Sequence, residues 1–228
     1  MQIEYRDLGT MEYEACWQLQ QELFDALLAR KRASERTADE KAGTLLLVEH
    51  LPVYTLGKSG KPDNLLVSQA ALEQMGARFF HIDRGGDITF HGPGQLVGYP
   101  ILDLEQIGIG LRDYIDALEE AVIRTVAHYG IVAGRVAGAS GVWLDEKSST
   151  PRKICAIGVR ASRFVTMHGF ALNVTTDLAW FGRINPCGFV DRGVTSIEKE
   201  IGSKPSMEEL KGLITNHLCE ILNVKIYK

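Results

Sequence analysis

The sequence contains four cysteines, and one of them lies in a loop context that suits a catalytic nucleophile. Cys16 and Cys219 fall in amphipathic helical patterns and Cys155 in an apolar strand pattern, where small buried thiols are common. Cys187 lies instead in the loop sequence INPCGFVDRG, between a proline and a glycine. Backbone N–H groups in such a loop can point at a developing oxyanion. Most loop cysteines are only loop residues, but Cys187 is the candidate for covalent catalysis.

A catalytic cysteine reacts as its thiolate, so a nearby cation or base must lower its pKa from about 8.5. Three side chains are candidates for that partner. His91 and His168 stand next to glycines, and Lys153 opens an otherwise apolar strand pattern. A lysine at the start of a strand usually faces solvent. In a water-poor pocket, however, its pKa falls from about 10.4 and it can exchange protons near neutral pH.

The segment RGGDITFHGPGQLVGYP at 84–100 is unusually rich in glycine. Such a run can present backbone N–H groups and a wall with few side chains to a substrate. It lacks the Gly-Lys-Ser/Thr of a P-loop and the GxGxxG of a dinucleotide fold, so a nucleotide-phosphate site has weak support. A set of structural turns explains the run equally well.

Periodicity in the sequence predicts the elements that must hold these residues. Apolar residues at helical spacing predict long helices over 11–33, 111–129 and 206–223, and a short one near 68–76. Strand-like patterns occupy 2–7, 44–50, 53–57, 95–104 and three stretches between 130 and 161. A Gly-Gly-Asp turn predicts a hairpin of FFHIDR with ITFHG, and the turn-rich segment 58–64 is expected to be a mobile loop. The mixture indicates one α/β domain.

A second hairpin is predicted where KICAIGVRA and FVTMHGFALNV flank a polar bend near residue 163. That bend places 156–158 opposite 169–171, within one residue of register, so that two glycines face each other. Glycine weakens a strand, and one reason to tolerate it is close approach of a ligand to the backbone. A bulge or tight packing against a helix is an equally good reason.

Composition excludes several classes of function. A chain of 228 residues with 45% hydrophobic residues can bury about 70% of its unfolded surface and needs no metal or disulfide to fold. A net charge of −4 and a pI near 5.9 give no attraction to nucleic acid or to an anionic membrane. No apolar run approaches a membrane span, and the cysteines follow no metal-ligand spacing. We expect a cytoplasmic protein with reduced thiols, no metal and no cofactor.

Four segments, in the same order along the chain, resemble the octanoyltransferases of lipoate biosynthesis, also called the lipoate-protein ligase B family. They are RGGDITFHGPGQLVGYPILDL at 84–104, RKICAIGVR at 152–160, HGFALNV at 168–174 and INPCGF at 184–189. The resemblance implies a single catalytic domain over 1–228. Its fold would be of the α+β type, with mixed and antiparallel sheets flanked by helices, as in biotin and lipoate ligases.

The resemblance also implies which residues act. Cys187 matches the family's acyl-thioester nucleophile and Lys153 the lysine that tunes it as general acid and base. Three segments match the family's substrate-binding residues, which here are Arg84, Gly85, Gly86, Asp87, Ile88, Thr89, Phe90, His91, Ala156, Ile157, Gly158, Gly169, Phe170 and Ala171. His91 could orient its loop or hydrogen-bond the substrate carbonyl, and a structural role explains it as well.

The implied reaction moves an octanoyl group from acyl carrier protein to a lysine of a lipoyl domain. The acceptors would be the lipoyl domains of 2-oxoacid dehydrogenase complexes and the glycine cleavage H protein. Two alternatives stay open. An ATP-dependent lipoate or biotin ligase shares the fold, although such ligases tend to carry an aspartate where this chain has Gly92. A non-catalytic scaffold that docks carrier domains would need neither Cys187 nor Lys153.

One residue departs from the family's pattern, which has a small residue without a thiol at position 155. Strict alternation along the strand puts Cys155 on the same face as Lys153, which would bring a second thiol to the pocket. Its apolar surroundings should raise its pKa, so Cys187 remains the expected nucleophile.

Overall fold

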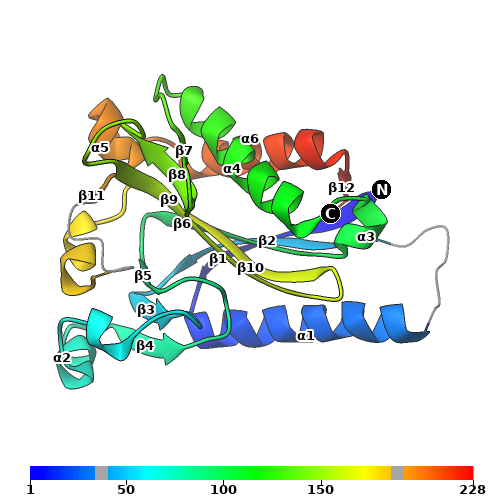
Figure 1. Cartoon of the computed structure of the whole chain (residues 1–228), viewed down its shortest axis with the longest axis horizontal. Helices are drawn as coiled ribbons and strands as arrows, with labels where there is room; N and C mark the ends of the chain where they lie inside the picture. The colour runs from blue at the N-terminus through cyan, green and yellow to red at the C-terminus, as the bar shows by residue number, and fades with distance from the viewer. Residues whose placement is uncertain (34–40, 186–192, 228) are drawn as a thin grey trace.

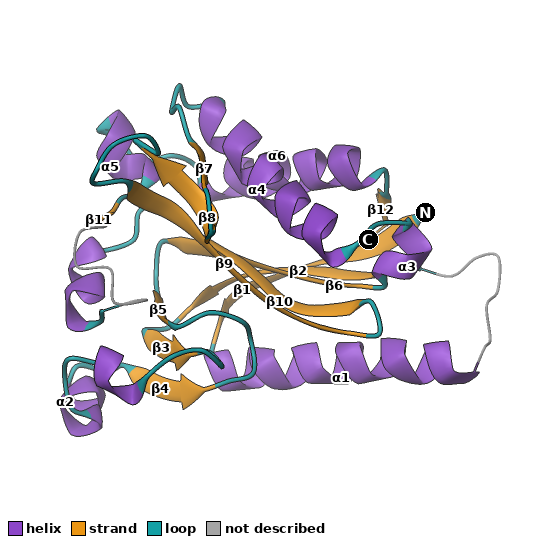
Figure 2. Ribbon diagram, in the orientation of Figure 1, coloured by secondary structure: helices purple, strands orange, loops and turns teal. Residues whose placement is uncertain are grey.

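The computed structural model describes residues 1–33, 41–185 and 193–227. A large twisted sheet crosses the centre, a small sheet stands at one end of it, and helices cover both faces of the large sheet (Figure 1, Figure 2). The fold is therefore mixed α/β, as the sequence predicts.

The described strands of the large sheet follow the order β12-β1-β2-β6-β10-β9-β8-β7, and β11 pairs with β9. Pairing is parallel for β1 with β2 and β12 and for β11 with β9, and antiparallel elsewhere. The strands are β1 (Gln2–Met11), β2 (Gly43–His50), β6 (Gln95–Leu102), β7 (Gly134–Val136), β8 (Ala139–Leu144), β9 (Arg152–Ser162), β10 (Val165–Asn173), β11 (Gly193–Val194) and β12 (Lys225–Tyr227).

Long helices pack on opposite faces of this sheet. Helix α1 (Tyr13–Ala33) lies along one face and buries a stripe that includes Cys16 and Phe24. On the other face lie α4 (Leu111–Ala127) and α6 (Met207–Leu222), which contribute to the largest apolar core (Figure 2). Apolar residues recur every three or four positions in these helices, which explains why the sequence pattern located all three. The short helices are α2 (Gln69–Gln74), α3 (Leu104–Ile107), α5 (Ile197–Ile201), η1 (Pro62–Asn64) and η2 (Leu178–Arg183).

The small sheet corrects one prediction. Its order is β4-β3-β5, with β3 (Val53–Leu56) parallel to β4 (Arg78–His81) and antiparallel to β5 (Ile88–His91). The predicted hairpin of FFHIDR with ITFHG is therefore wrong, because β3 lies between the two strands. Local turn residues at 85–87 suggested that the two strands pair directly. Instead, the apolar strand β3 at 53–56 forms hydrogen bonds with both of them.

The predicted hairpin of β9 with β10 is confirmed. Gly158 lies opposite Gly169, Ile157 opposite Phe170 and Ala156 opposite Ala171. The bend falls at Arg163 and Phe164, both with positive φ. Segments 156–158 and 169–171 are thus side by side at the centre of the large sheet.

We expect Gly98→Ala in β6 to destabilise the fold, because an added Cβ would lie 2.2 Å from Cζ of Phe170. Overpacking of this kind typically costs about 1–3 kcal/mol. Gly212→Ala is a matched control, since Gly212 lies in α6 with nothing within 4 Å of an added Cβ. Alanine in a helix should instead stabilise the protein by about 0.5–1 kcal/mol. Urea unfolding of both variants checks the two signs, and equal effects would contradict the prediction.

Candidate functional site

A cavity of about 490 Å³ opens between the large sheet and the small one, within the size range of small-molecule sites. Its walls come from β5, β6, β8, β9 and β10, the loop 84–87 and the start of α4. Most of the residues that the sequence singled out line it. They are Arg84, Gly85, Gly86, Asp87, Ile88, Thr89, His91, Lys153, Ala156, Ile157, Gly158, Gly169, Phe170 and Ala171.

Two of the singled-out residues are not among the described lining. The ring of Phe90 stacks on Trp180 at 5.2 Å between centroids and packs against Phe181, in the core of the small sheet. Cys187 lies outside the described residues.

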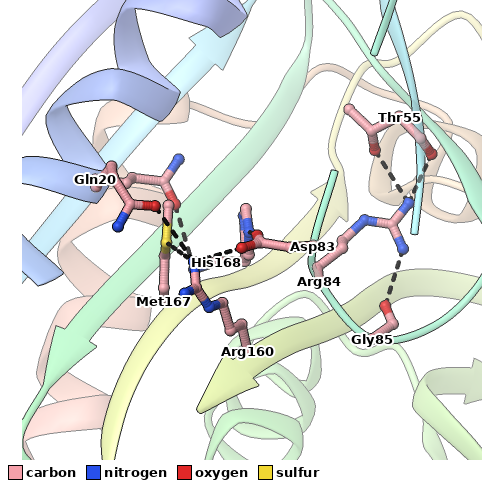
Figure 3. Close-up of polar contacts among 9 residues, drawn as sticks. Gln20, Thr55, Asp83, Arg84, Gly85, Arg160, Met167 and His168 are labelled. Carbon is pink, nitrogen blue, oxygen red and sulfur yellow. Dashed lines mark hydrogen bonds and ion pairs between the residues drawn. The ribbon is translucent and has the colours of Figure 1, made fainter. Parts of the chain in front are cut away.

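The loop 84–86 is held tightly over β9. The guanidinium of Arg84 donates to the carbonyl and hydroxyl of Thr55 and to the carbonyl of Gly85, as Figure 3 shows. The N–H of Gly85 donates to the carbonyl of Val159 at 2.9 Å. The turn at 57–60 presses from the other side, with N–H groups of Lys58 and Ser59 bonded to carbonyls of this loop. The first predicted binding segment is therefore rigid and lies directly on the second.

This packing answers why two glycines face each other in the β9–β10 hairpin. A Cβ at Gly158 would lie 2.9 Å from the carbonyl oxygen of Gly85. A Cβ at Gly169 would lie 2.2 Å from the carbonyl oxygen of Gly98. Neighbouring backbone comes close to both glycines. The structure supports tight packing, but against the backbone of a loop and of strand β6 rather than against the helix that the sequence suggested.

A β-bulge aims Lys153 into the cavity. Cys155 lies opposite Val142 on β8, but Lys153 lies opposite the next residue, Trp143, which leaves Ile154 without an opposite on β8. A bulge of this kind re-aims the side chain next to it. The ammonium of Lys153 lies 4.4 Å from the ring centroid of Trp143, a cation–π contact. The backbone carbonyl of Ala139 accepts a hydrogen bond from the indole N–H of Trp143, which fixes the orientation of that ring.

The same bulge corrects the predicted placement of Cys155. Because one extra residue interrupts the alternation, Cys155 and Ile154 both enter the main apolar core while Lys153 lines the cavity. Cys155 is completely buried, and burial raises the pKa of its thiol well above the ordinary value. It is not a competing nucleophile in the pocket.

Residues described on either side of segment 186–192 line the cavity. Ile184 lines it on one side, and Gly193 and Val194 line it on the other. Val194 on β11 is the register partner of Lys153. The N–H of Asn185 donates to the carbonyl of Asn64, whose side-chain amide donates to Asp87.

Three buried histidines lie in or beside the cavity wall: His91 and His168 line it, and the ring of His50 lies 6.0 Å from that of His91. Burial lowers the pKa of His50 to about 4 and that of His91 to about 3, because it disfavours the charged imidazolium. His168 has a positive φ and bonds Asp83 at 3.0 Å, and Arg160 bonds the other oxygen of that carboxylate (Figure 3). Desolvation also lowers the pKa of His168. The site therefore keeps its histidines neutral.

Sequence reasoning missed several cavity residues. Tyr13 comes from α1, and Gln95, Trp143 and Asn173 come from three strands of the large sheet. Gln95 stands in the glycine-rich segment 84–100 and Asn173 in the motif HGFALNV at 168–174, so those motifs could have drawn attention to both. Tyr13 and Trp143 stand in ordinary helix and strand patterns, so only the tertiary structure reveals that they line the cavity.

Among the described residues, no group of His, Cys, Asp and Glu could hold a metal ion. The helices of the described chain are all too short or too polar to cross a membrane.

Comparison with known proteins identifies relatives. Residues 12–219 match the family described as lipoyl protein ligase A/B catalytic domain. An octanoyltransferase of Bacteroides fragilis is 52% identical over 216 residues, which cover 95% of this chain and 96% of the relative.

Solved structures show the same fold. A bi-partite lipoate protein ligase from Thermoplasma acidophilum superposes with a TM-score of 0.72 at 15% identity, over 100% of this chain and 86% of that one. Biotin protein ligase from Aquifex aeolicus, in complex with biotin and ATP, gives a TM-score of 0.53 at 14% identity, over 96% and 70%. At these identities the likeness shows the fold alone, which confirms the predicted architecture.

We expect the unfolding free energy to fall as the pH drops from 6.5 to 5. The unfolded chain binds protons on His50 and His91 near pH 6.5, whereas the native state keeps both neutral down to about pH 4. The loss should be about 1 kcal/mol per pH unit for each histidine. Urea unfolding at several pH values measures it. His50→Asn should flatten the slope, and the exposed His81→Gln should not; equal slopes in all three proteins would refute the assignment.

Proposed function

Because the chain belongs to the lipoyl protein ligase A/B catalytic domain family and is an acyltransferase of the octanoyltransferase type, we propose that it carries the octanoyl group on Cys187. Residues 1–228 form one catalytic domain in this proposal. The acyl donor is octanoyl acyl carrier protein. The acceptor is a lysine of a lipoyl domain in 2-oxoacid dehydrogenase complexes or of the glycine cleavage H protein.

One observation carries the proposal. The bulge in β9 aims the side chain of Lys153 into a cavity that is also lined by Ile184 and Gly193, which precede and follow Cys187 in the sequence. Val194 is opposite Lys153, and Asn185, two residues before Cys187, is tied to Asn64. A lysine in such a cavity is the partner that a cysteine nucleophile requires.

The first step exchanges one thioester for another. Lys153 takes the proton of the Cys187 thiol, and the thiolate attacks the octanoyl carbonyl carbon. The bond to the carrier's sulfur breaks, and that thiol leaves with the proton returned by Lys153. The sum of the step is nearly balanced in free energy.

The second step forms an amide. The amine of the acceptor lysine attacks the acyl carbon on Cys187, and Lys153 accepts the proton that the amine loses. The Cys187 thiolate leaves and regains a proton, which restores the enzyme. General acid–base help of this kind contributes about 10²–10⁴-fold in rate.

The cavity suits an aliphatic tail. Apolar side chains on its wall include Val97, Leu111, Ile115, Phe170 and Phe181. An eight-carbon acyl chain offers about seven groups to bury, worth about 5 kcal/mol in total. The segments 84–91, 156–158 and 169–171 bind the acyl donor in this proposal, with Phe90 supporting them from the core of the small sheet.

The packing of Gly92 favours transfer over ATP-dependent ligation. A Cβ at that position would lie 2.4 Å from the ring of Phe90. The aspartate that ligases tend to carry there would therefore displace this ring from its stack on Trp180.

Intact-protein mass after incubation with an octanoyl thioester tests the nucleophile. The protein should gain one octanoyl group that hydroxylamine removes, without ATP. Cys187→Ala should gain none, because the sulfur is gone, and the buried Cys155→Ala serves as the matched control that still gains it. A scaffold would gain nothing in any variant, and persistent loading of Cys187→Ala would refute the assignment.

Lys153→Ala should slow acyl loading by about 100-fold or more at neutral pH, because the thiol loses its proton acceptor. The deficit should shrink above pH 9, where a thiol of pKa about 8.5 ionises unaided. Lys204→Ala, an exposed lysine between α5 and α6, is the control. Quenched-flow mass measurements across pH check both points, and unchanged loading in Lys153→Ala would overturn the role.

A further inference from the structure

His91 is buried in the wall of the cavity, yet the steps proposed above leave it without a chemical role. It ends a chain of side-chain hydrogen bonds that starts at a backbone carbonyl. The carbonyl of Thr195 accepts from Nδ2 of Asn173 at 3.0 Å, and Oδ1 of Asn173 accepts from Nε2 of Gln95 at 2.9 Å. Oε1 of Gln95 then bonds Nδ1 of His91 at 2.8 Å.

The direction of every bond in this chain is determined. A backbone carbonyl can only accept, so the Asn173 atom that faces Thr195 must be the amide nitrogen. Gln95 is fixed twice, because its Nε2 also donates to the carbonyl of Phe90 at 3.1 Å. The remaining oxygen of Gln95 must therefore accept, and Nδ1 of His91 must carry the hydrogen.

The other ring nitrogen of His91 is consequently an acceptor. Burial, together with the nearby His50, Arg84 and His168, lowers the pKa of His91 to about 3. A neutral imidazole with its hydrogen on Nδ1 presents a lone pair at Nε2. No residue in the described parts of the chain forms a hydrogen bond with Nε2, and His91 lines the cavity.

We propose that Nε2 of His91 accepts a hydrogen bond from an N–H group of the bound substrate. This role rests on the acyl transfer proposed above. Two substrates supply such a group: the amine of the acceptor lysine and the amide of the pantetheine arm of the acyl donor. The acyl carbonyl has no hydrogen to give, so His91 does not bind it, in contrast to one of the roles considered from the sequence.

This series of hydrogen bonds also connects His91 to the strand that bears Lys153. The N–H of Thr195 donates to the carbonyl of Lys153 at 2.9 Å, while its carbonyl holds Asn173. The orientation of the imidazole is thus set by the same β9–β11 pairing that brackets Lys153. His91 is too weak a base to take a proton from an ammonium group, so it orients the N–H while Lys153 moves the proton.

Two substitutions separate binding from structure. In His91→Asn the side-chain amide can still donate to Gln95 in place of Nδ1, but nothing occupies the place of Nε2. In His91→Gln the side-chain oxygen can reach the place of Nε2, but the donor to Gln95 is lost. The proposal expects His91→Asn to be impaired and His91→Gln to recover; a structural role expects the reverse.

The experiment measures three steps in the full-length protein: loading from octanoyl-pantetheine, loading from the amide-free octanoyl thioester of 2-mercaptoethanesulfonate, and single-turnover transfer from the acyl-enzyme to a lipoyl domain. His91→Asn should slow the step that uses the N–H by about 10-fold, as expected for one lost hydrogen bond. Slower transfer identifies the lysine amine, and slower loading from octanoyl-pantetheine identifies the pantetheine amide. Loading from the amide-free thioester gives the reference rate, and the step that uses the N–H should slow about 10-fold more than this reference.

Equal slowing of the amide-free reaction, or no slowing of any step, would overturn this role alone. Failure of the unsubstituted protein to form an acyl-enzyme would overturn the proposed function and this role with it. Nitrogen-15 NMR of the histidine side chains gives a readout independent of activity. It should show hydrogen on Nδ1 of His91 from pH 5 to 8, and hydrogen on Nε2 would refute the assignment.

Discussion

The bulge at Ile154 is the constraint on which the site depends. One extra residue in β9 lets Ile154 and Cys155 enter the core while Lys153 turns into the cavity. Without it, alternation would put Lys153 and Cys155 on one face, so that either a charge would be buried in the core or a second thiol would reach the pocket. Both outcomes are costly, the first because an unpaired buried charge loses its hydration. A local irregularity in the sheet thus separates the groups that must react from those that must not.

Close backbone contacts hold the loop 84–86 in place in the cavity wall. The loop 84–86 rests on β9 through the bond from Gly85 to Val159, and Arg84 fastens it to Thr55. Such contacts need glycine, since a Cβ at Gly158 would collide with the loop. The segments that the family resemblance marks as binding residues are therefore also packing residues. Rigid walls favour catalysis because the polar groups are already oriented when the substrate arrives.

Among the described residues that line the cavity, the positively charged side chains are Lys153 and Arg84. His50, His91 and His168 all have pKa values lowered by burial. Neutral imidazoles neither repel the ammonium of Lys153 nor compete with it for protons. They still offer directed hydrogen bonds, and the chain from Thr195 to His91 shows how backbone carbonyls determine that direction.

Sequence by itself determined the long helices, the β9–β10 register and the family, because periodicity and motif order are local properties of the chain. It also picked Lys153 and most of the cavity wall, since glycine-rich segments differ from ordinary strands. It placed Cys155 wrongly and paired β4 with β5, because a bulge and a competing strand depend on neighbours distant in sequence. The contacts of Trp143 with Lys153 and of Gln95 with His91 were not predicted, although Gln95 and His91 stand in the same glycine-rich segment. Only the tertiary structure decided these contacts, because they depend on the bulge that aims Lys153 and on the hydrogen bonds that orient Gln95.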